Sequence, residues 1–339
     1  MKQPRKTDRT VSVVVVAFRR LDQVRRLLRS LERQKFRAFE VILVDNAKSA
    51  ELRNCVGRMK ARSRLGLIYV PNDNTGYAGG NVTGIRYTKA ELILVLNPDT
   101  WLERNTIQKL YDQFMRSPDR TGVLVPKVMI SDSDLINSIG QKAWKENLYV
   151  NIGYLEKDQS QYDVPREVEA FDGAAFMFKR TILNSTYLFD PSFFHGQEVV
   201  DLAERVRELG FEIWTCPDAI VHHEMGGTIG PQERHYLRVL LVRNALIHTM
   251  RNRGLTPLLR TMVFGFLRMN VYWGLKVKKY DEVIITMEGI FRFFVDSGIC
   301  RVSYSAVQKQ VKSSFHNRER REHSQKDQAA SGMMRGIPI

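Results

Sequence analysis

The sequence has little cysteine and no long uncharged apolar run. Its three cysteines, Cys55, Cys216 and Cys300, are widely spaced and form no C-x-x-C pair, so they support neither a disulfide framework nor a zinc site. No stretch reaches the roughly 18 uncharged apolar residues that a membrane span needs. The apolar run 11–18 follows a polar, charged start and is too short for a secretory signal. We therefore expect a cytoplasmic protein.

Two common phosphate-binding signatures are also absent. The stretch 72–81 reads N-D-N-T-G-Y-A-G-G-N, without the G-x-G-x-x-G spacing of the dinucleotide fold or the Lys-Ser/Thr pair of a P-loop. A glycine-rich loop before a helix could still present backbone N–H groups to phosphate. Asn and Gly are equally typical of turns and helix caps, so both interpretations stay open from these residues alone.

What is present is a large apolar content and an uneven positive charge. The 339 residues are 43% hydrophobic, enough for one large domain or two moderate ones. Residues 231–339 hold 19 Lys and Arg against 8 Asp and Glu, which places +11 of the net charge of +15 in the last third. This basic segment predicts attraction to something anionic, and composition does not choose between lipid headgroups and nucleic acid.

Apolar runs separated by helical patterns predict an α/β fold. Strands are expected at 11–18, 40–45, 66–70 and 91–97, and a helix after the first of them has Val24, Leu27, Leu28 and Leu31 on one face. This alternation indicates βαβ units and a mostly parallel sheet flanked by helices. Right-handed crossovers then place the strand ends at one carboxyl edge, with Phe18, Asp45, Pro71 and Asp99 along it.

The second half of this region is less regular. We expect a helix at 107–115, a strand at 122–126, loops and hairpins at 131–166, and a strand at 168–178 interrupted by small residues at 173–175. Gly173 would let a ligand approach the backbone there. A helix within 193–210 should bury Leu202, Val206 and Leu209 and end at Gly210.

Three polar groups stand at the ends of these elements. Asp99 follows Pro98, which ends a buried strand, and a carboxylate there can hold Mg²⁺ or Mn²⁺ against a diphosphate; the alternative is a turn Asp. His223 ends an apolar run and is either structural or a metal ligand. Glu198 and Asp201 lie in the first turn of a helix, where they either favour the helix dipole or carry out chemistry.

Taken together, these motifs resemble the inverting family 2 glycosyltransferases with the A-type nucleotide-sugar fold, and within them the rhamnosyltransferase-like branch. The resemblance covers about 11–242, and its motifs occur in the family's order. They are D-N at 45–46, N-x-G-[FY]-A-x-G-N at 74–81, L-N-P-D at 96–99, G-A-A at 173–175, F-D-x-x-F-F at 189–194, D-L-x-x-R at 201–205 and P-x-A-x-x-x-H-x-x-G-G-[ST] at 217–228.

The resemblance implies roles for single residues. Asp45 would contact the nucleoside base, Asn97 the ribose, and Asp99, in place of the family's D-x-D signature, would coordinate Mg²⁺ or Mn²⁺ on the diphosphate, with His223 joining the metal or the diphosphate. The metal would neutralise charge on the departing nucleoside diphosphate. The other residues assigned to nucleotide-sugar binding are Phe18, Asn46, Asn74, Gly76, Gly80, Asn81 and Gly173.

One position departs from the family pattern. The family usually has Glu-Asp-x-Asp-Leu at the acidic helix start, and its second residue is assigned as the general base, but this sequence has Val199 there. An inverting transfer needs a carboxylate that accepts the proton of the acceptor hydroxyl. Glu198 is our first choice for this role and Asp201 the second. The remaining alternative is a non-catalytic homologue that binds a nucleotide sugar or a glycan.

The basic C-terminal part is expected to be helical. Helices are predicted at 233–250, 258–279 and 283–294, and a disordered tail at 314–339. The 258–279 segment is suited to lie in an anionic membrane surface or to pack as core. The expected domains are therefore a nucleotide-sugar-binding domain at 1–230, a helical basic extension at 231–313 and the tail at 314–339.

The predicted function follows from this resemblance. We expect metal-assisted transfer, with inversion, of a sugar from a nucleotide-diphosphate sugar, dTDP-rhamnose being one example, to a glycan or polyprenyl-linked acceptor. Attachment to the inner face of the cell membrane is an open alternative to a free cytoplasmic protein. We expect no nucleic-acid partner, because no basic sheet with interleaved aromatics is present.

Overall fold

The computed structural model describes residues 10–63, 65–144, 149–224, 231–262 and 280–296. The chain divides into two compact units, 1–263 and 264–339. The predicted tail at 314–339, most of the predicted surface helix and the end of the last family motif lie outside the described residues. The predicted domain boundaries stay a prediction.

The first unit is built on a nine-stranded mixed sheet with the order β3-β2-β1-β4-β10-β6-β11-β5, and β7 pairs with β6. The neighbouring strands β3, β2, β1 and β4 all run parallel to one another, and β6 runs parallel to β11. In contrast, β10 is antiparallel to both β4 and β6. The strands are β1 Val11–Ala17, β2 Phe39–Asp45, β3 Gly66–Pro71, β4 Leu92–Leu96, β5 Thr100–Leu102, β6 Thr121–Ile130, β7 Ile136–Ser138, β10 Ala175–Lys179 and β11 Glu212–His223. The expected α/β fold with a mostly parallel sheet is confirmed.

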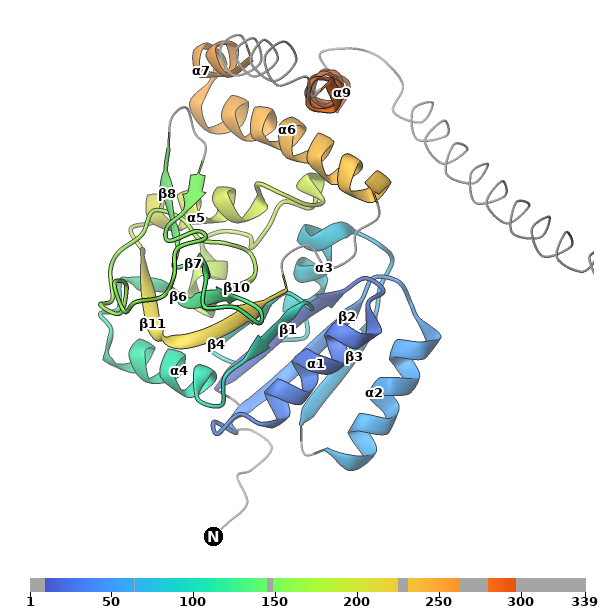
Figure 1. Cartoon of the computed structure of the whole chain (residues 1–339), viewed down its shortest axis with the longest axis vertical. Helices are drawn as coiled ribbons and strands as arrows, with labels where there is room; N and C mark the ends of the chain where they lie inside the picture. Colours follow the sequence, from blue (N-terminus) through green and yellow to red (C-terminus); the bar gives the residue numbers. More distant parts are fainter. Residues whose placement is uncertain (1–9, 64, 145–148, 225–230, 263–279, 297–339) are drawn as a thin grey trace, which may run out of the picture. The chain divides into compact units, whose positions relative to one another are not determined.

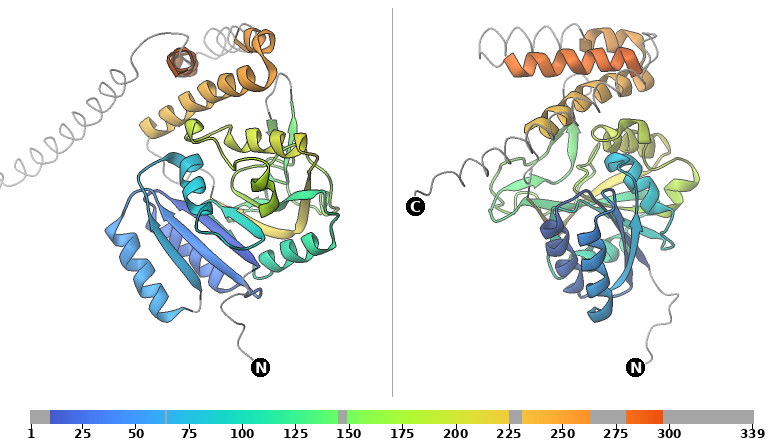
Figure 2. Two further views of the ribbon diagram at one scale, coloured as in Figure 1. Left: turned by 180° about the vertical axis from the view of Figure 1, so that it is seen from behind. Right: turned by 90° about the vertical axis from the view of Figure 1, so that its right-hand side faces the viewer.

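Helices cover both faces of this sheet. The helices are α1 Leu21–Glu32, α2 Ala50–Arg62, α3 Gly76–Ile85, α4 Thr106–Arg116 and α5 Glu198–Glu208. Apolar residues of α1, α2 and α4 share one buried cluster with alternate residues of β1, and those of α3 and α5 share the other. α1 therefore lies in front of the strands in Figure 1 and behind them in the reverse view of Figure 2. The central strands are buried on both faces, which explains why they read as continuous apolar runs.

Two local predictions were wrong. The segment 168–174 is not a strand, because its backbone makes only isolated bridges, such as that of Ala170 to Gln141, and the regular strand β10 starts at Ala175. Leu209 is 41% exposed rather than inward. It lies past the last turn of α5, where the chain turns through Gly210 at φ +83°.

The segment 131–166 forms short strands and turns, as expected. Its hairpin pairs β8 Gln141–Ala143 with β9 Tyr149–Asn151 in a separate two-stranded sheet. This segment leads back to the central sheet through the turn before β10 and so contributes side chains to its carboxyl edge.

The glycines of α3 allow this helix to lie close to its neighbours. A Cβ at Gly80 would lie 2.5 Å from Cγ1 of Val16, and a Cβ at Gly84 would lie 2.6 Å from Cγ1 of Val14. Gly76 has φ +70°, and a Cβ there would collide with the backbone of Phe194. Close packing of α3 on β1 and on Phe194 therefore accounts for these glycines without a phosphate ligand.

We expect Gly80→Ala to destabilise the protein by about 1–3 kcal/mol, because the added methyl group overpacks the contact with Val16, a stiff β-branched residue. Gly57→Ala in α2 is the matched control, since nothing lies within 4 Å of its added Cβ, and it should stabilise the helix by about 0.5–1 kcal/mol. Urea unfolding of both variants measures whether each substitution lowers or raises the free energy of unfolding. A neutral Gly80→Ala would show that α3 can move away from the sheet at little cost.

The C-terminal helices of the first unit are α6 Pro231–Arg253 and α7 Leu255–Arg260. α6 buries Leu240 and Ile247, whereas Leu241 is 42% exposed. The second unit is described only for α9 Tyr280–Asp296, which confirms the helix predicted at 283–294.

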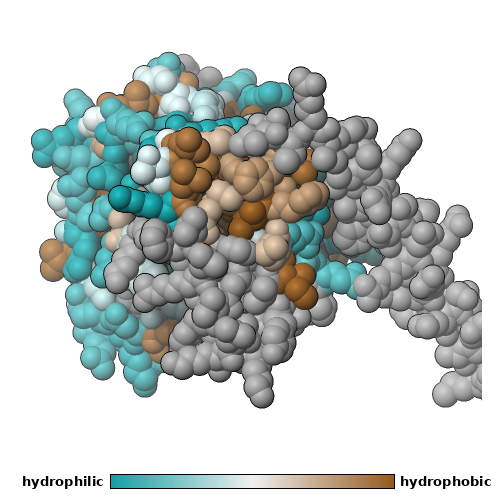
Figure 3. All heavy atoms as spheres, turned by 90° about the horizontal axis from the view of Figure 1, so that it is seen from above, coloured by the Kyte–Doolittle hydropathy of each residue, from teal (hydrophilic) through white to brown (hydrophobic). Residues whose placement is uncertain are grey.

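Exposed apolar side chains occur on all three of these helices. In Figure 3, some hydrophobic residues are visible near the middle of the view, and hydrophilic residues predominate on its left-hand side. The large apolar side chains exposed on these helices are Leu241, Leu255, Leu259, Ile284, Met287 and Phe291. In the part of the chain that is described, no helix combines the length and apolar character needed to span a bilayer.

Candidate active site

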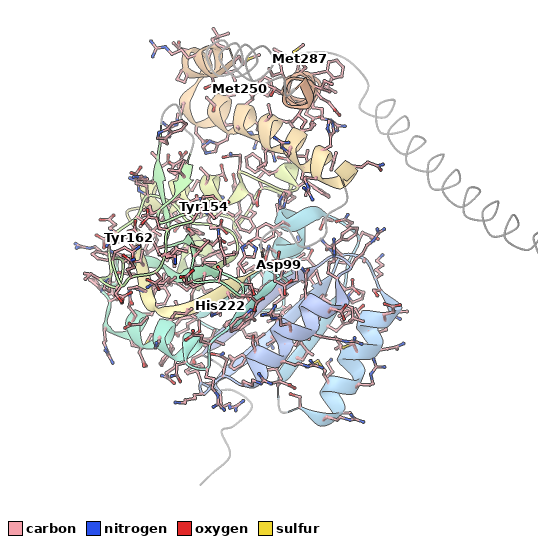
Figure 4. All side chains as sticks on the ribbon, viewed as in Figure 1. Asp99, Tyr154, Tyr162, His222, Met250 and Met287 are labelled. Carbon is pink, nitrogen blue, oxygen red and sulfur yellow. The ribbon has the colours of Figure 1, made fainter. Side chains whose placement is uncertain are left out.

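A cavity of about 430 Å³ opens at the carboxyl edge of the sheet. Most of its lining comes from the turn after β4, the turn before β10, the start of α5 with the loop before it, and the end of β11. Individual residues of α3, the β8–β9 hairpin and α6 complete it. Its acidic and histidine side chains are Asp99, Asp172, Glu198, His195 and His223. Ligands bind at this edge in open α/β sheets, and Figure 4 shows Asp99 near the centre of the molecule.

Asp99 and His223 face each other across this cavity. Nε2 of His223 lies 3.3 Å from Oδ1 of Asp99, but the contact lacks hydrogen-bond geometry, and this buried Oδ1 has no hydrogen-bond partner among the described residues. On the other side of the ring, Nδ1 of His223 lies 2.8 Å from Oδ1 of Asn137. Because that amide oxygen only accepts, Nδ1 carries the proton and Nε2 is directed at Asp99.

The pKa of His223 reflects these neighbours. Burial lowers it, but the carboxylates of Asp99, Asp172 and Glu224 raise it more, so that it lies above its ordinary value. Without a further cation beside Asp99, protonation of His223 is therefore favoured. A bound cation would take the place of that proton.

The donor set fits a hard divalent cation that is shared with a ligand. The Asp99 oxygen, which accepts no hydrogen bond from a described residue, and the imidazole nitrogen of His223, whose ring is oriented by Asn137, are two suitable donors. Within the described ranges, no three His, Cys, Asp or Glu side chains are grouped to hold an ion. Mg²⁺ and Mn²⁺ are often held by one or two protein ligands together with substrate phosphates, so Asp99 and His223 could hold such an ion at a diphosphate.

The neighbouring His222 has a different environment. Successive strand residues point to opposite faces, and the ring of His222 stacks on Trp101 with centroids 3.7 Å apart. Its Nε2 lies 3.5 Å from Glu103, and burial lowers its pKa. His222 is thus a packed side chain, and only His223 of the pair lines the cavity.

Glu198 is the buried acid of the cavity. It is the first residue of α5, only 4% exposed, and its Oε2 has no hydrogen-bond partner in the described structure. Burial is the main cause that raises its pKa to about 7, against backbone N–H groups that lower it; the negative charges of Asp201 and Asp172 raise it further. A carboxylate with this pKa is suited to accept a proton near neutral pH.

Asp201 is held elsewhere. Its Oδ2 accepts a hydrogen bond from Nε of Arg205 at 2.9 Å, and Nη2 of Arg205 forms an ion pair with the same oxygen at 2.8 Å. Arg205 also donates to the backbone carbonyls of Tyr187 and Leu188. Asp201 does not line the cavity, and its geometry is that of a structural ion pair.

Val199 lies on the cavity wall beside Gly173. A Cβ added at Gly173 would be 3.1 Å from Cγ2 of Val199 and 3.3 Å from the hydroxyl of Tyr77. That hydroxyl donates to the carbonyl of Gly173 at 2.8 Å. Gly173 thus permits close packing between the turn before β10, α3 and α5.

Asn97 completes this side of the cavity. Its backbone N–H donates to the carbonyl of Ala174 at 2.9 Å, which fixes the end of β4 against the turn before β10. Its side-chain Oδ1 is buried without a hydrogen-bond partner among the described residues. Asn97, Asp99, Gly173, Glu198 and His223 are therefore the predicted residues that the fold brings together.

The other predicted residues lie outside this cavity: Asp201 is in α5, and the rest lie around the ends of β1 and β2 and in or before α3. The carboxylate of Asp45 is fully buried and accepts hydrogen bonds from the N–H of Ala47 and of Ser49 and from the hydroxyl of Tyr69, at 3.0, 2.8 and 2.6 Å. Asn46 donates to the carbonyl of Gly76 at 2.9 Å. Those not lining the cavity are Phe18, Asp45, Asn46, Asn74, Gly76, Gly80, Asn81 and Asp201.

Sequence reasoning missed several side chains here. Asp172 lines the cavity, and its Oδ1 accepts the N–H of Ala174 at 2.7 Å; its position directly before Gly173 was the available signal. Asn137 and Gln141 come from the irregular segment 131–166, where no pattern singled them out. Tyr77, at the aromatic position of the 74–81 motif, and His195, directly after the 189–194 motif, also line the cavity; neither was assigned a role.

A larger open groove, of about 1120 Å³, lies along α1 and the start of α4. It is lined by six basic and three acidic side chains and contains none of the predicted site residues. Size alone does not identify a site, whereas convergent polar groups with perturbed pKa values do. We therefore assign the candidate active site to the smaller cavity.

Comparisons with known proteins agree with this fold. The low-salt glycan biosynthesis hexosyltransferase Agl10 of Haloferax volcanii is 24% identical over 211 residues, which are 61% of this chain and 64% of that protein. This match therefore spans less than two thirds of the relative.

Solved structures of glycosyltransferases share the fold. GalNAc-T7 with UDP, GalNAc and Mn²⁺ aligns with TM-score 0.54 and 18% identity, over 69% of this chain and 48% of that one. S. aureus TarS aligns with TM-score 0.52 and 16% identity, over 80% and 46%. The mannosyltransferase PcManGT of Pyrobaculum calidifontis, in complex with GDP-Man and Mn²⁺, aligns with TM-score 0.51 and 15% identity, over 90% and 79%.

The family itself is shown by the sequence. Residues 12–184, just over half of the chain, match the family described as Glycosyl transferase family 2. This range runs from β1 to the turn after β10 and so includes Asp99 and most of the sheet. The expected A-type glycosyltransferase fold is thus confirmed, and the chain belongs to glycosyl transferase family 2.

Proposed function

We propose that the protein transfers a hexosyl group from a nucleoside-diphosphate sugar to an acceptor hydroxyl, with inversion. The observation that carries this proposal is that one cavity contains an Asp99 oxygen that accepts no hydrogen bond within the described part of the chain and lies 3.3 Å from Nε2 of His223, together with a buried Glu198 with a pKa of about 7. The first pair suits a cation on a diphosphate, and the second group suits proton abstraction. Family membership and the hexosyltransferase Agl10 support the same activity.

The donor end of the site uses the carboxyl edge. Asp99 and His223 would hold Mg²⁺ or Mn²⁺, which when bound would neutralise charge on the departing nucleoside diphosphate. GalNAc-T7 and PcManGT, which share the fold, are structures with Mn²⁺ and a nucleotide or nucleotide sugar. Asp45, Asn46 and the turn before α3 would line the nucleoside, at the ends of the neighbouring strands.

Glu198 would act on the acceptor. Its carboxylate accepts the proton of the acceptor hydroxyl while the oxygen attacks the anomeric carbon, and the bond from that carbon to the diphosphate oxygen breaks. A single displacement of this kind inverts the anomeric configuration. Burial of Glu198, which is 4% exposed, would keep its carboxylate away from bulk water and favour transfer over donor hydrolysis.

We also propose a candidate donor and a candidate acceptor. dTDP-rhamnose is our candidate donor from the sequence resemblance, and a glycan or polyprenyl-linked glycan our candidate acceptor. The exposed apolar residues Leu255 and Leu259 of α7 support a peripheral contact with anionic lipid. Most of the predicted surface segment lies beyond the described residues.

A second candidate function is nucleotide-sugar or glycan binding without catalysis. Val199 favours it, because this residue stands where the family usually has its acid, and it contacts the cavity. The raised pKa and unpaired oxygen of Glu198 favour catalysis instead.

A donor screen tests the proposal. UDP-, GDP- and dTDP-sugars are incubated with the protein, with and without Mn²⁺, and binding and slow donor hydrolysis are measured. We expect at least one donor to bind only with Mn²⁺ and to be turned over. Metal-dependent binding without turnover of any bound donor, including with glycan acceptors, would support the second function. Absence of binding to every nucleotide sugar would contradict the first function, and absence of binding to every nucleotide sugar and glycan would contradict both.

A further inference from the structure

One side chain of α6 holds the loop that leads into Glu198. Asn244 is fully buried, and its Nδ2 lies 2.8, 2.9 and 2.8 Å from the carbonyl oxygens of Phe193, His195 and Gly196. An amide NH₂ group has two hydrogens, so these three acceptors share them. A single side chain thus satisfies three carbonyls of one short loop.

The orientation of the Asn244 amide is itself fixed. Nη1 of Arg243 donates to Oδ1 of Asn244 at 2.6 Å and to the carbonyl of Ser192 at 2.9 Å. This contact occupies the oxygen end of the amide and leaves the NH₂ end for the loop. Arg243 and Asn244 therefore hold the chain from Ser192 to Gly196 by hydrogen bonds.

The loop needs such support because of its backbone. Phe194, Gly196 and Gln197 have φ values of +60°, +88° and +70°. Non-glycine residues in such conformations cost about 1–3 kcal/mol each and persist only when the surroundings hold them. Gln197 is also the N-cap of α5 and contributes no side-chain cap hydrogen bond, so the start of α5 is defined by this loop.

The loop is also fixed from the other side. The carbonyl of Phe194 accepts the N–H of Ala78 in α3 at 3.1 Å, and Gly76 leaves room for this approach. Leu241 of α6 packs on Gly196 and lines the cavity. The loop is therefore held by contacts with both α3 and α6, directly before Glu198, which lines the cavity.

We propose that Asn244 is a positioning residue, which holds the loop 193–197 in its strained conformation and thereby sets the direction in which Glu198 enters the cavity. This inference rests on the proposed role of Glu198. It makes α6, which follows the matched family range, a part of the active site rather than an appended helix.

The test compares two substitutions with a matched control. Asn244→Asp keeps the shape but places oxygens against the three carbonyls, and Asn244→Ala removes the amide. The control is Thr249→Val, since Thr249 lies in the same helix, is equally buried and bonds only within it, to the carbonyl of Ala245. The donor found in the screen is used for kinetics, and thermal unfolding and amide hydrogen exchange are measured on the full chain.

We expect kcat to fall by about 10- to 100-fold in both Asn244 variants, because a displacement of about 1 Å of a reacting group can cost this much. KM for the donor should stay within about twofold, since the donor end of the site lies on the strands. Backbone amides of 194–198 should exchange faster. Thr249→Val should lower the melting temperature with kcat nearly unchanged.

Two results would overturn the inference: unchanged kcat in the folded Asn244 variants, or a loss of kcat that Thr249→Val shares in proportion to its loss of stability. Amide exchange reads the loop directly, whether or not Glu198 is the base, and Glu198→Gln in the same assay tests the base alone. If the loop amides exchange faster in the Asn244 variants but Glu198→Gln keeps full turnover, the proposed role of Glu198 is refuted, and with it the positioning role of Asn244. The hydrogen bonds from Asn244 to the loop would then be a structural contact only.

Discussion

Replacing Glu198 by Gln is expected to lower kcat by about 10²- to 10⁴-fold, the usual contribution of a general base. Donor binding should change little, because Gln has nearly the same shape and the donor end of the cavity belongs to Asp99 and His223. Steady-state kinetics and calorimetric donor binding on the same preparation separate the two effects. Glu208→Gln, at an exposed position of the same helix, is the control and should behave as wild type.

The pH dependence gives this prediction a second readout. Because the pKa of Glu198 is raised to about 7, the active, deprotonated form accumulates as the pH rises through 7, and kcat of the wild type should rise over the same range. The residual activity of Glu198→Gln should lack this limb. Turnover by the variant that equals the wild type at pH 8 would eliminate Glu198 as the base.

Glu198 should also affect folding stability, which is expected to fall over the pH range in which kcat rises. Its folded pKa of about 7 lies above its ordinary value of 4.5, so the folded state binds the proton more tightly. The resulting stability is fully present below pH 4.5 and is lost as the pH rises through 7, by an amount on the order of 3 kcal/mol at most. Glu198→Gln should therefore be more stable than the wild type at pH 8 and similar to it near pH 4.

Replacing Asp99 by Asn is expected to abolish the effect of Mn²⁺ on nucleoside-diphosphate binding and to lower turnover by at least about 100-fold. Loss of a charged ligand from a site with two protein ligands removes most of its cation affinity, and the charge stabilisation that depends on it amounts to several kcal/mol. Binding of UDP, GDP and dTDP with and without Mn²⁺, by calorimetry, measures this directly.

The controls for Asp99 distinguish the site from general charge. Asp134→Asn removes an exposed carboxylate paired with Lys157 at 3.3 Å and should leave the Mn²⁺ effect unchanged. Asn137→Ala should weaken Mn²⁺ binding by about 10- to 100-fold, because the bond that orients His223 is lost. If Asp99→Asn still binds the nucleotide better with Mn²⁺, Asp99 is not a ligand of the ion.

Much of the sheet could be predicted from the sequence, because the central strands are buried on both faces and therefore form continuous apolar runs. The ends of β1, β2, β3 and β4 were predicted within about two residues, and Pro98 marked the turn that exposes Asp99. The segment 168–174 was mistaken for strand because its apolar residues are equally compatible with a buried turn. Its side chains Val168, Ala170 and Phe171 are indeed buried.

The candidate site could be predicted only in part. Asp99 and His223 were assigned to one metal site by the family resemblance, and the structure places Nε2 of His223 3.3 Å from Oδ1 of Asp99. The irregular segment 131–166 hid Asn137, since nothing local indicates that its side chain meets His223, 86 residues away. The choice between Glu198 and Asp201 also needed the fold, because both lie in the first turn of α5.

For this protein, the sequence by itself determined the α/β fold, the order of the motifs and the position of Asp99 at the carboxyl edge, since these depend on local apolar patterns and chain direction. Only the tertiary structure decided which acid faces the cavity, because that depends on contacts between distant segments. Arg205 holds Asp201 in an ion pair, whereas Glu198 is buried with one oxygen unpaired. Its direction follows from a loop held by Asn244 in α6, a long-range packing contact that no local pattern encodes.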